Sequence, residues 1–274
     1  MKTFLYFAIL SLLTLLPAVA MSQNGIDVSR FQDSINWSKV AKNSKIEFVY
    51  VKASEGASIR DPMYSYNVKQ ARKAGLLVGS YHVYSSRTTA YQQFANFKKV
   101  VGKNKQDIVP VLDIEANHCN KLYMQRVDKL LELMEKEYGA KPMIYTSEKL
   151  YKTHFDIKKY KKYHFFIANY KREPAVAYTL WQYTQHGKQR GIAGFVDLSK
   201  FNKKYTVKNI KIPSKDSVAN DSVRQVKPKP PAANKTNKTT VKKSPSYAGG
   251  GSGSKPVSAA KKQPATSPSG TKKK

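Results

Sequence analysis

Residues 109 to 117 read VPVLDIEAN, an apolar run that ends in two acidic residues with one residue between them. In an extended strand, residues i and i+2 point to the same face and lie about 6.6 Å apart along the chain. Asp113 and Glu115 would therefore project together, while Ile114 faces the other way. A solvated strand end is the ordinary explanation of such a pair, and only the surrounding sequence can show whether the pair has a function.

Eight short segments between residues 24 and 205 have the composition of β-strands. The first six are nearly continuous apolar runs, which are typical of strands buried on both faces. The segments span residues 25–29, 47–53, 76–84, 108–115, 142–147, 164–170, 179–184 and 194–199.

Helical patterns lie between several of these strands, at residues 61–75, 88–102 and 119–139. Alternating strands and helices predict a parallel sheet. The first four connections, and on a weaker pattern the fifth, can hold a crossover. The last two, of eight and nine residues, are shorter than the dozen or more that a parallel crossover needs. We therefore predict an α/β fold, a single-domain (β/α)5(β)3 barrel that resembles a small, irregular TIM barrel.

The first twenty residues have the three parts of a secretory signal peptide. Lys2 supplies a basic start, an apolar stretch follows, and AVA ends at Ala20 as a small-residue cleavage site. The apolar stretch is too short for a spanning helix, although a membrane anchor is the alternative. We expect cleavage after Ala20, a secreted or periplasmic protein, and no membrane span. The single cysteine, Cys119, excludes an internal disulfide.

The net charge of +31 is unevenly distributed. Residues 213–274 contain fourteen Lys or Arg and two Asp, a net +12, and almost no large apolar side chain. This composition predicts a disordered basic tail that follows a folded domain at residues 21–212. Without the tail and the single lysine of the signal peptide, that domain still carries +18. Such a charge favours an anionic partner, which could be nucleic acid, a membrane surface or an acidic polymer.

Polar side chains gather where the predicted strands end. They are Asp27, Lys52 with Glu55 just beyond it, Tyr81, His82, Asp113, Glu115, Tyr145, Asn169, Gln182 and Asp197. In a parallel barrel, active sites are built at the carboxyl ends of the strands. Four carboxylates from the first, fourth and eighth strands would meet at one mouth, beside aromatic rings suited to stacking on a sugar. A solvated strand end no longer explains the acidic pair.

Nine motifs occur in the order and spacing of glycoside hydrolase family 25. They are GIDVSRFQ, YVKASEG, DPMYSYN, AGLLVGSYHVY, PVLDIE, PMIYTS, FIANY, LWQYT and GFVDLSKFN. The resemblance covers roughly residues 24 to 202, and it implies a lysozyme of the muramidase type with a (β/α)5(β)3 barrel. The sequence departs from the family at Arg30 and Phe31, where many members carry His and Trp, and at Val83 and Tyr84, where Phe is frequent.

The resemblance also implies roles for the four carboxylates. Glu115 matches the general acid/base, Asp113 is its neighbour, and Asp27 and Asp197 complete the cluster. Two carboxylates about 5.5 Å apart repel by about 3 kcal/mol at an effective dielectric near 20, so one of them can stay protonated near neutral pH. The second step could use an enzyme nucleophile, a base-activated water or the N-acetyl group of the substrate. The resemblance favours the N-acetyl group, with Asp113 orienting it.

Six further residues are candidates for substrate contact. They are Tyr81, Tyr145, Trp181, Gln182, Asn169 and His82. Aromatic residues at strand ends often only pack, and His82 is equally compatible with a hydrogen-bonded core histidine. The five histidines and one cysteine show no ligand spacing, and the glycine-rich stretch in the tail lacks the strand and helix of a phosphate loop. We therefore expect neither a metal nor a cofactor.

Three functions from different classes fit these features. The first is a secreted peptidoglycan hydrolase that cleaves the β-1,4 bond between N-acetylmuramic acid and N-acetylglucosamine. The second is a non-catalytic glycan-binding protein that uses the barrel mouth, and the four intact carboxylates argue against it. The third, a binder of nucleic acid or of a membrane surface, is suggested by charge alone. We expect a monomer whose catalytic domain, residues 21–212, acts on peptidoglycan glycan strands. We expect its basic tail to contact anionic cell-wall polymers, and we expect no specific nucleic-acid partner.

Overall fold

The computed structural model describes residues 24–42, 45–102, 106–116 and 119–212. The predicted signal peptide at residues 1–20 and the predicted basic tail at residues 213–274 lie outside these ranges. The predicted catalytic domain is described from Asn24 onward.

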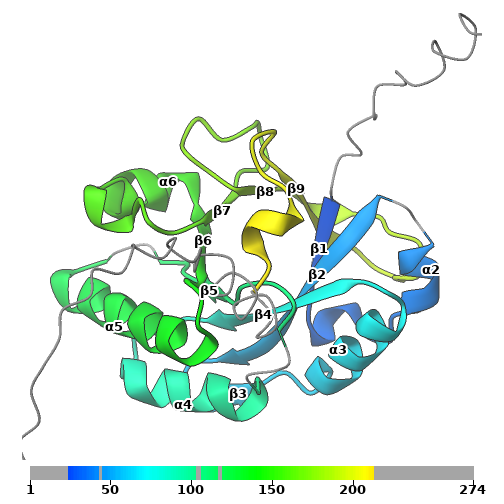
Figure 1. Ribbon diagram of the computed structural model, residues 1–274, viewed down its shortest axis with the longest axis horizontal. Coiled ribbons are helices and arrows are strands. Elements are labelled where there is room, and N and C mark those ends of the chain that lie inside the picture. Colours follow the sequence, from blue (N-terminus) through cyan, green and yellow to red (C-terminus); the bar gives the residue numbers. More distant parts are fainter. Residues whose placement is uncertain (1–23, 43–44, 103–105, 117–118, 213–274) are drawn as a thin grey trace, which may run out of the picture. The chain divides into compact units, whose positions relative to one another are not determined.

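Eight strands form a closed barrel (Figure 1). In order around the barrel they are β1 (Asn24–Val28), β2 (Ile46–Glu55), β4 (Leu77–Val83), β5 (Val111–Asp113), β6 (Met143–Ser147), β7 (Phe165–Ala168), β8 (Leu180–Gly187) and β9 (Val196–Phe201). Strand β1 closes the ring because it pairs with β2 on one side and with β9 on the other. A two-residue strand, β3 (Ile59–Arg60), extends the end of β2 as a hairpin. The predicted (β/α)5(β)3 barrel is confirmed.

A helix follows each of the first five strands of the barrel, and these helices flank it in Figure 1. They are α2 (Trp37–Ala41), α3 (Tyr64–Lys73), α4 (Ala90–Val100), α5 (Lys121–Tyr138) and the short α6 (Glu148–Leu150), which continues as a π turn (Tyr151–Phe155) and a 3-10 turn (Lys158–Tyr160). No helix within the described ranges is both long enough and apolar enough to cross a bilayer.

The bounds of the long helices follow from local hydrogen bonding. The Thr89 side chain accepts the Gln92 backbone N–H at the start of α4, and the Asn120 side chain accepts the Tyr123 N–H at the start of α5. Helix α5 ends at Gly139, whose φ of 69° is the left-handed conformation that glycine adopts without strain. These positions reproduce the predicted helices to within a few residues.

The core has two parts, one inside the barrel and one between the barrel and its helices. Inside the barrel, the rings of Phe48 and Tyr50 pack close to the backbone of neighbouring strands. A Cβ at Gly25 would lie 2.1 Å from the Phe48 ring, and a Cβ at Gly79 would lie 2.3 Å from the Tyr50 ring. Glycine at these two positions therefore leaves space for the aromatic rings that fill the barrel interior below its mouth.

The prediction that both of the last two connections are too short for a parallel crossover is wrong for the first of them. Strands β7 and β8 pair in parallel, although only residues 169–179 join them and no helix lies between. Backbone bonds from Thr179 N to Phe165 O (2.8 Å) and from Asn169 N to Gln182 O (3.2 Å) extend the pairing at both ends. The loop therefore has to run back only over the length of one short strand, and residues 169–179 can do so without a helix.

The second of these connections leads to an antiparallel strand, as expected. Strand β9 runs opposite to both β8 and β1, so its beginning lies at the same rim as the carboxyl ends of the parallel strands. Asp197 is the second residue of β9, and it lies opposite Asp27 in the register of β1. Asp197 thus reaches the mouth from the start of a strand, whereas the sequence placed it near a strand end.

Candidate active site

A cavity of about 210 Å³ opens at this rim, and all four predicted catalytic carboxylates line it. Asp27 comes from β1, Asp113 from the end of β5, Glu115 from just beyond β5, and Asp197 from β9. Three of the six residues predicted to contact substrate also line the cavity, namely Tyr81, Tyr145 and Gln182. The structure therefore brings together seven of the ten predicted site residues from six strands.

The acidic pair owes its orientation to the strand that precedes it. Strand β5 ends at Asp113, but the Ile114 N–H still donates to the Tyr145 carbonyl at 2.9 Å, so the chain remains extended. Ile114 is fully buried among the outer core, and Asp113 and Glu115 face the cavity. Asp113 is half-buried and Glu115 is exposed. Two acids one residue apart therefore differ in their contact with solvent.

Gln182 links the acidic residues of β1 to the phenols of the rim. Its Nε2 donates to Asp27 Oδ2 at 3.0 Å, and its Oε1 accepts the hydroxyls of Tyr145 at 2.8 Å and Tyr170 at 2.7 Å. Both hydroxyls need an acceptor, and this requirement fixes which end of the amide faces Asp27. The side chain is buried, so the chain of bonds holds one wall of the cavity in a single arrangement.

Burial raises the pKa of three carboxyls in the cavity. For Asp27 the neighbouring Asp197 adds to the effect of burial, and the hydrogen bond from Gln182 opposes it. For Asp113 the effect of burial is followed by that of the Glu115 charge. Burial and then Glu115 raise the pKa of Asp197 to about 6. Removing water from like charges in this way favours protonated carboxyls near neutral pH.

Two buried carboxylate oxygens in the cavity wall have no hydrogen-bond partner among the described residues. They are Oδ1 of Asp27 and Oδ1 of Asp113. A buried acceptor without a donor costs about 1 to 3 kcal/mol. A ligand N–H or O–H that donated to either oxygen would recover that free energy. These two oxygens are therefore the positions where a hydrogen bond would add most to the binding free energy of a polar ligand.

Trp181, Asn169 and His82 lie outside the cavity lining. The Trp181 ring nitrogen donates to the Asn169 carbonyl at 2.7 Å, and the Lys200 ammonium lies 4.6 Å from the Trp181 ring centre. Asn169 caps the turn after β7, where its Oδ1 accepts the Lys171 backbone N–H at 3.1 Å. These contacts give Trp181 and Asn169 structural roles beside the cavity, and their contact with substrate stays a prediction.

His82 is fully buried in a polar network behind the rim. The Gln93 Oε1 accepts the Ser85 backbone N–H at 2.8 Å and also faces His82 Nε2 at 3.2 Å. His82 Nε2 must therefore carry the proton, which leaves Nδ1 to accept from the Ser54 hydroxyl at 2.8 Å. Burial lowers the pKa of His82 to about 4, so the ring is neutral at physiological pH.

This network predicts a specific loss of stability in acid. The pKa of His82 is lower in the folded chain than in the unfolded one, so its contribution is complete above pH 6.5 and is lost as the pH falls toward 4. Between pH 7 and pH 5 the wild type should lose about 2 kcal/mol of unfolding free energy that His82→Gln does not lose. Urea unfolding of both proteins at the two pH values measures this difference. The exposed His186→Gln serves as the control, and a difference between wild type and His82→Gln that stayed constant with pH would contradict the prediction.

Tyr170 and Gln185 are two polar lining residues that the sequence did not single out. Tyr170 follows Asn169 directly. Strand alternation could have placed its side chain at the cavity only if the end of β7 at Ala168 had been known. Gln185 lies in β8, one residue beyond the predicted end of that strand at residue 184. No sequence signal identifies either residue, because both depend on where strands end.

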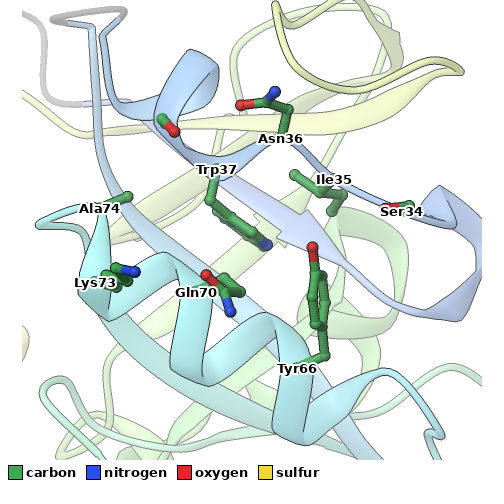
Figure 2. A pocket seen from close by; sticks show the side chains of 9 residues that line it. Ser34, Ile35, Asn36, Trp37, Tyr66, Gln70, Lys73 and Ala74 are labelled. Atoms are coloured by element: carbon green, nitrogen blue, oxygen red, sulfur yellow. The ribbon is translucent and has the colours of Figure 1, made fainter.

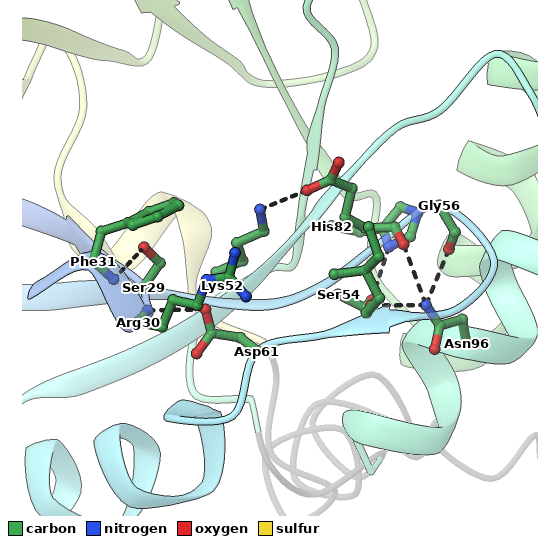
Figure 3. A network of polar contacts seen from close by, with 11 residues as sticks. Ser29, Arg30, Phe31, Lys52, Ser54, Gly56, Asp61, His82 and Asn96 are labelled. Atoms are coloured by element: carbon green, nitrogen blue, oxygen red, sulfur yellow. Dashed lines mark hydrogen bonds and ion pairs between the residues drawn. The ribbon is translucent and has the colours of Figure 1, made fainter. Parts of the chain in front are cut away.

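A second network fixes the rim around β1, β2 and β4 (Figure 3). The Asp61 carboxylate accepts the Arg30 backbone N–H at 2.9 Å and so ties the turn after β1 to the start of the α3 segment. The Asn96 amide donates to the carbonyls of Gly56 and Ile59, both at 3.0 Å, and so holds the β2–β3 hairpin against α4. These side-chain bonds to backbone groups connect the loops and the hairpin around this part of the rim.

Lys52 belongs to the same rim and is directed toward Glu55, with 2.7 Å between Nζ and Oε2. Its charge opposes the rise in the pKa of Asp113 that burial causes. Among the described residues, no group of three or more His, Cys, Asp or Glu side chains is arranged to hold a metal ion. The arrangement suits proton transfer and hydrogen bonding by carboxyls to a neutral, hydroxyl-rich ligand.

A barrel whose acidic mouth gathers carboxyls from separate strands is typical of glycoside hydrolases. The model of glycosyl hydrolases family 25 matches residues 26–192 of this sequence. The match covers more than half of the chain and all of the residues that line the acidic cavity except Asp197. The chain belongs to glycoside hydrolase family 25.

Individual relatives agree with the family match. The chain is 35% identical over 189 residues to the YegX protein of Escherichia coli strain K12, with 65% of this chain and 69% of the relative covered. It is 32% identical over 209 residues to lysozyme M1 of Streptomyces globisporus, with 69% and 71% covered. The crystal structure of the bacterial lysozyme from Streptomyces coelicolor is similar with a TM-score of 0.63 and 27% identity, over 72% of this chain and 99% of that one.

Proposed function

We propose that this glycoside hydrolase is a muramidase, which cleaves the β-1,4 bond between N-acetylmuramic acid and N-acetylglucosamine in peptidoglycan. The observation that carries the proposal is the pairing of an exposed Glu115 with a half-buried Asp113 in one acidic cavity. Glycoside hydrolysis needs an acid that reaches the glycosidic oxygen and a second group on the sugar side. Relatives named as lysozymes support this choice of substrate.

Glu115 acts as the general acid/base in this proposal. Its exposed carboxyl donates a proton to the leaving oxygen of the glycosidic bond, and its carboxylate later takes a proton from the attacking water. Asp197, whose pKa of about 6 leaves it mostly ionised at pH 7, supplies negative charge beside the oxocarbenium-like transition state, and Asp27 faces it across β1 and β9.

Asp113 orients the N-acetyl group of the substrate. Its unpartnered Oδ1 can accept the acetamido N–H, which turns the acetyl oxygen toward the anomeric carbon. That oxygen then forms the bond that replaces the departing glycosidic oxygen, and water opens the resulting ring in the second step. The hydrogen bond strengthens as the acetamido nitrogen gains positive charge, so it favours the transition state over the ground state.

Clearing of purified cell walls tests the proposal against its alternative, a non-catalytic glycan-binding protein that uses the same mouth. A hydrolase lowers the turbidity of a wall suspension and releases soluble fragments, whereas a binding protein sediments with walls that stay intact. Binding without any release of fragments would reject the muramidase proposal and favour the alternative.

We further propose that the protein acts outside the cytoplasm and that its basic tail holds it on the wall. Both ideas rest on the sequence alone: the signal pattern of residues 1–20, and the net charge of +12 on residues 213–274. Peptidoglycan and its attached polymers are commonly anionic, so many weak contacts with a basic segment would raise the local enzyme concentration.

Removal of residues 213–274 should separate wall binding from catalysis. The truncated protein is expected to hydrolyse short soluble glycan fragments at the wild-type rate, because the described cavity contains no residue of the tail. Its sedimentation with intact walls should fall at low salt, and the two proteins should converge as salt rises, because charge contacts beyond about 10 Å are screened at 0.1 M. Equal sedimentation of both proteins at every salt concentration would leave the tail as a spacer.

A further inference from the structure

A second cavity, of about 440 Å³, lies on the outside of the barrel between α2 and α3 (Figure 2). It is built from the turn before α2, from Trp37 at the start of that helix, and from one face of α3. None of its lining residues lines the acidic cavity. Its volume falls in the range of small-ligand sites, and no step of the proposed hydrolysis uses it.

Trp37 gives this α2–α3 cavity an unsatisfied hydrogen-bond donor. The side chain is only 4% exposed, and its Nε1–H has no acceptor among the described residues. In Figure 2 the ring nitrogen points toward the space between Gln70 and Tyr66. An unpaired buried N–H is unusual in a folded protein, and an acceptor oxygen from a ligand would satisfy it once the half-buried Gln70 side chain moved aside.

The rest of the lining suits a ligand with many hydroxyl groups. Tyr66 is 41% exposed at the open side of the cavity, so its ring can pack against a sugar ring while its hydroxyl stays wet. Ser34 and Ser38 contribute exposed hydroxyls, and the Gln70 amide contributes both donors and an acceptor. A pyranose has an apolar face that can pack on the aromatic ring and hydroxyl groups at its edge that can bond to the donors and acceptors around it.

Lys73 adds a positive charge to one end of the cavity. Its side chain is exposed and forms no ion pair with any described residue, and no acidic residue lines the cavity. An ammonium group in this position favours an anionic ligand. The absence of lining carboxyls also means that these residues offer no acid/base pair to cleave a bound sugar.

We propose that the α2–α3 cavity is a second saccharide site, which binds a sugar unit carrying a carboxylate and does not cleave it. The Trp37 N–H and the Gln70 amide would bind ring oxygens and hydroxyls, Tyr66 would cover one face of the sugar, and Lys73 would pair with the carboxylate. The site would hold a neighbouring stretch of acidic glycan while the mouth of the barrel acts elsewhere. This proposal does not depend on the proposed cleavage reaction.

The fluorescence of Trp37 offers a direct test. The chain contains two tryptophans, so Trp181→Phe leaves Trp37 as the single reporter in the full-length protein. Titration with N-acetylmuramic acid should give a saturable change in emission with a Kd on the order of millimolar. Neutral N-acetylglucosamine should bind at least about fivefold more weakly. Equal responses to the two sugars would overturn the assignment of an acidic ligand.

Two variants in the same background localise the response. Tyr66→Ala and Lys73→Gln should each weaken the binding of N-acetylmuramic acid at least about fivefold. Their matched controls are Tyr91→Ala, at a tyrosine of α4 that is 62% exposed, and Lys69→Gln, at an exposed lysine of α3 outside the cavity. No change in emission with N-acetylmuramic acid, or a change that survives both cavity variants, would overturn the site.

Hydrolysis provides the second measurement. Tyr66→Ala and Lys73→Gln should both cleave short soluble glycan fragments at the rate of the Trp181→Phe parent, because neither residue lines the acidic cavity. A fall in that rate with either variant would overturn the separation of the two sites. The sugar titration and the cleavage assay can therefore fail independently of each other.

Discussion

Glu115→Gln is expected to lower kcat on cell-wall glycan by about 10² to 10⁴ while leaving the fold unchanged. The amide keeps the shape of the carboxyl but cannot deliver a proton to the glycosidic oxygen. Glu115 is exposed at the mouth, so the substitution disturbs no buried contact. Initial rates of fragment release from purified walls, with thermal unfolding measured on the same samples, give the result.

The same variant has an electrostatic consequence that can be measured separately. Glu115 contributes to the raised pKa of Asp113 and of Asp197, so its neutralisation should lower the pKa of Asp197 from about 6. Carboxyl chemical shifts followed over pH by NMR would record that change. Glu132→Gln, on the solvent side of α5, is the matched control and should alter neither activity nor the titration of Asp197. Wild-type cleavage by Glu115→Gln would show that another group is the acid.

Asp113→Asn is expected to lower kcat by roughly 10² or more and to make the protein more stable. The lost activity follows because an amide cannot offer the same negatively charged acceptor to the acetamido N–H as that nitrogen gains positive charge. The gain in stability follows because burial and the nearby Glu115 charge raise the pKa of Asp113, so its ionised form destabilises the folded chain. The unfolding midpoint should therefore rise at pH values where the wild-type carboxyl is ionised.

This opposite movement of activity and stability distinguishes a functional carboxylate from a structural one. A structural Asp113 would lose stability together with activity when it became Asn, because a needed acceptor would have been removed. The exposed Asp156→Asn is the control and should change neither quantity. An Asp113→Asn protein that unfolds more readily and still cleaves walls at the wild-type rate would contradict the proposed role.

The barrel and its acidic mouth could be predicted from the sequence because both depend on local patterns. Apolar runs mark buried strands, and polar residues at their ends mark the rim. The parity of an extended chain was sufficient to place Asp113 and Glu115 on one face, and Ile114 is indeed buried behind them. Closure of the ring followed from the number of strands.

The same alternation explains why some residues that were predicted to contact substrate do not line the cavity. Adjacent residues of a strand point to opposite faces, so His82 and Tyr81 cannot both line one mouth. The structure places Tyr81 toward the cavity and His82 behind it, and in β8 it places Gln182 inward and Trp181 outward. Which member of each pair faces inward depends on strand register, which local composition does not determine.

Features that depend on tertiary placement could not be predicted at all. Tyr170 reaches the mouth because the chain turns after Ala168 and its hydroxyl finds Gln182. The parallel crossover of residues 169–179 is possible because the strands that it joins are paired over only a few residues. The α2–α3 cavity brings Trp37 and Tyr66 together from two helices whose sequences show no shared motif.

Chemical identification of the ends that the enzyme creates tests the central claim most directly. Purified peptidoglycan would be digested, the new reducing ends would be converted to alditols with borohydride, and the fragments would be identified by mass spectrometry. Cleavage on the reducing side of N-acetylmuramic acid predicts that every new alditol derives from N-acetylmuramic acid. New ends that derive from N-acetylglucosamine, or solubilised fragments without new reducing ends, would contradict the account.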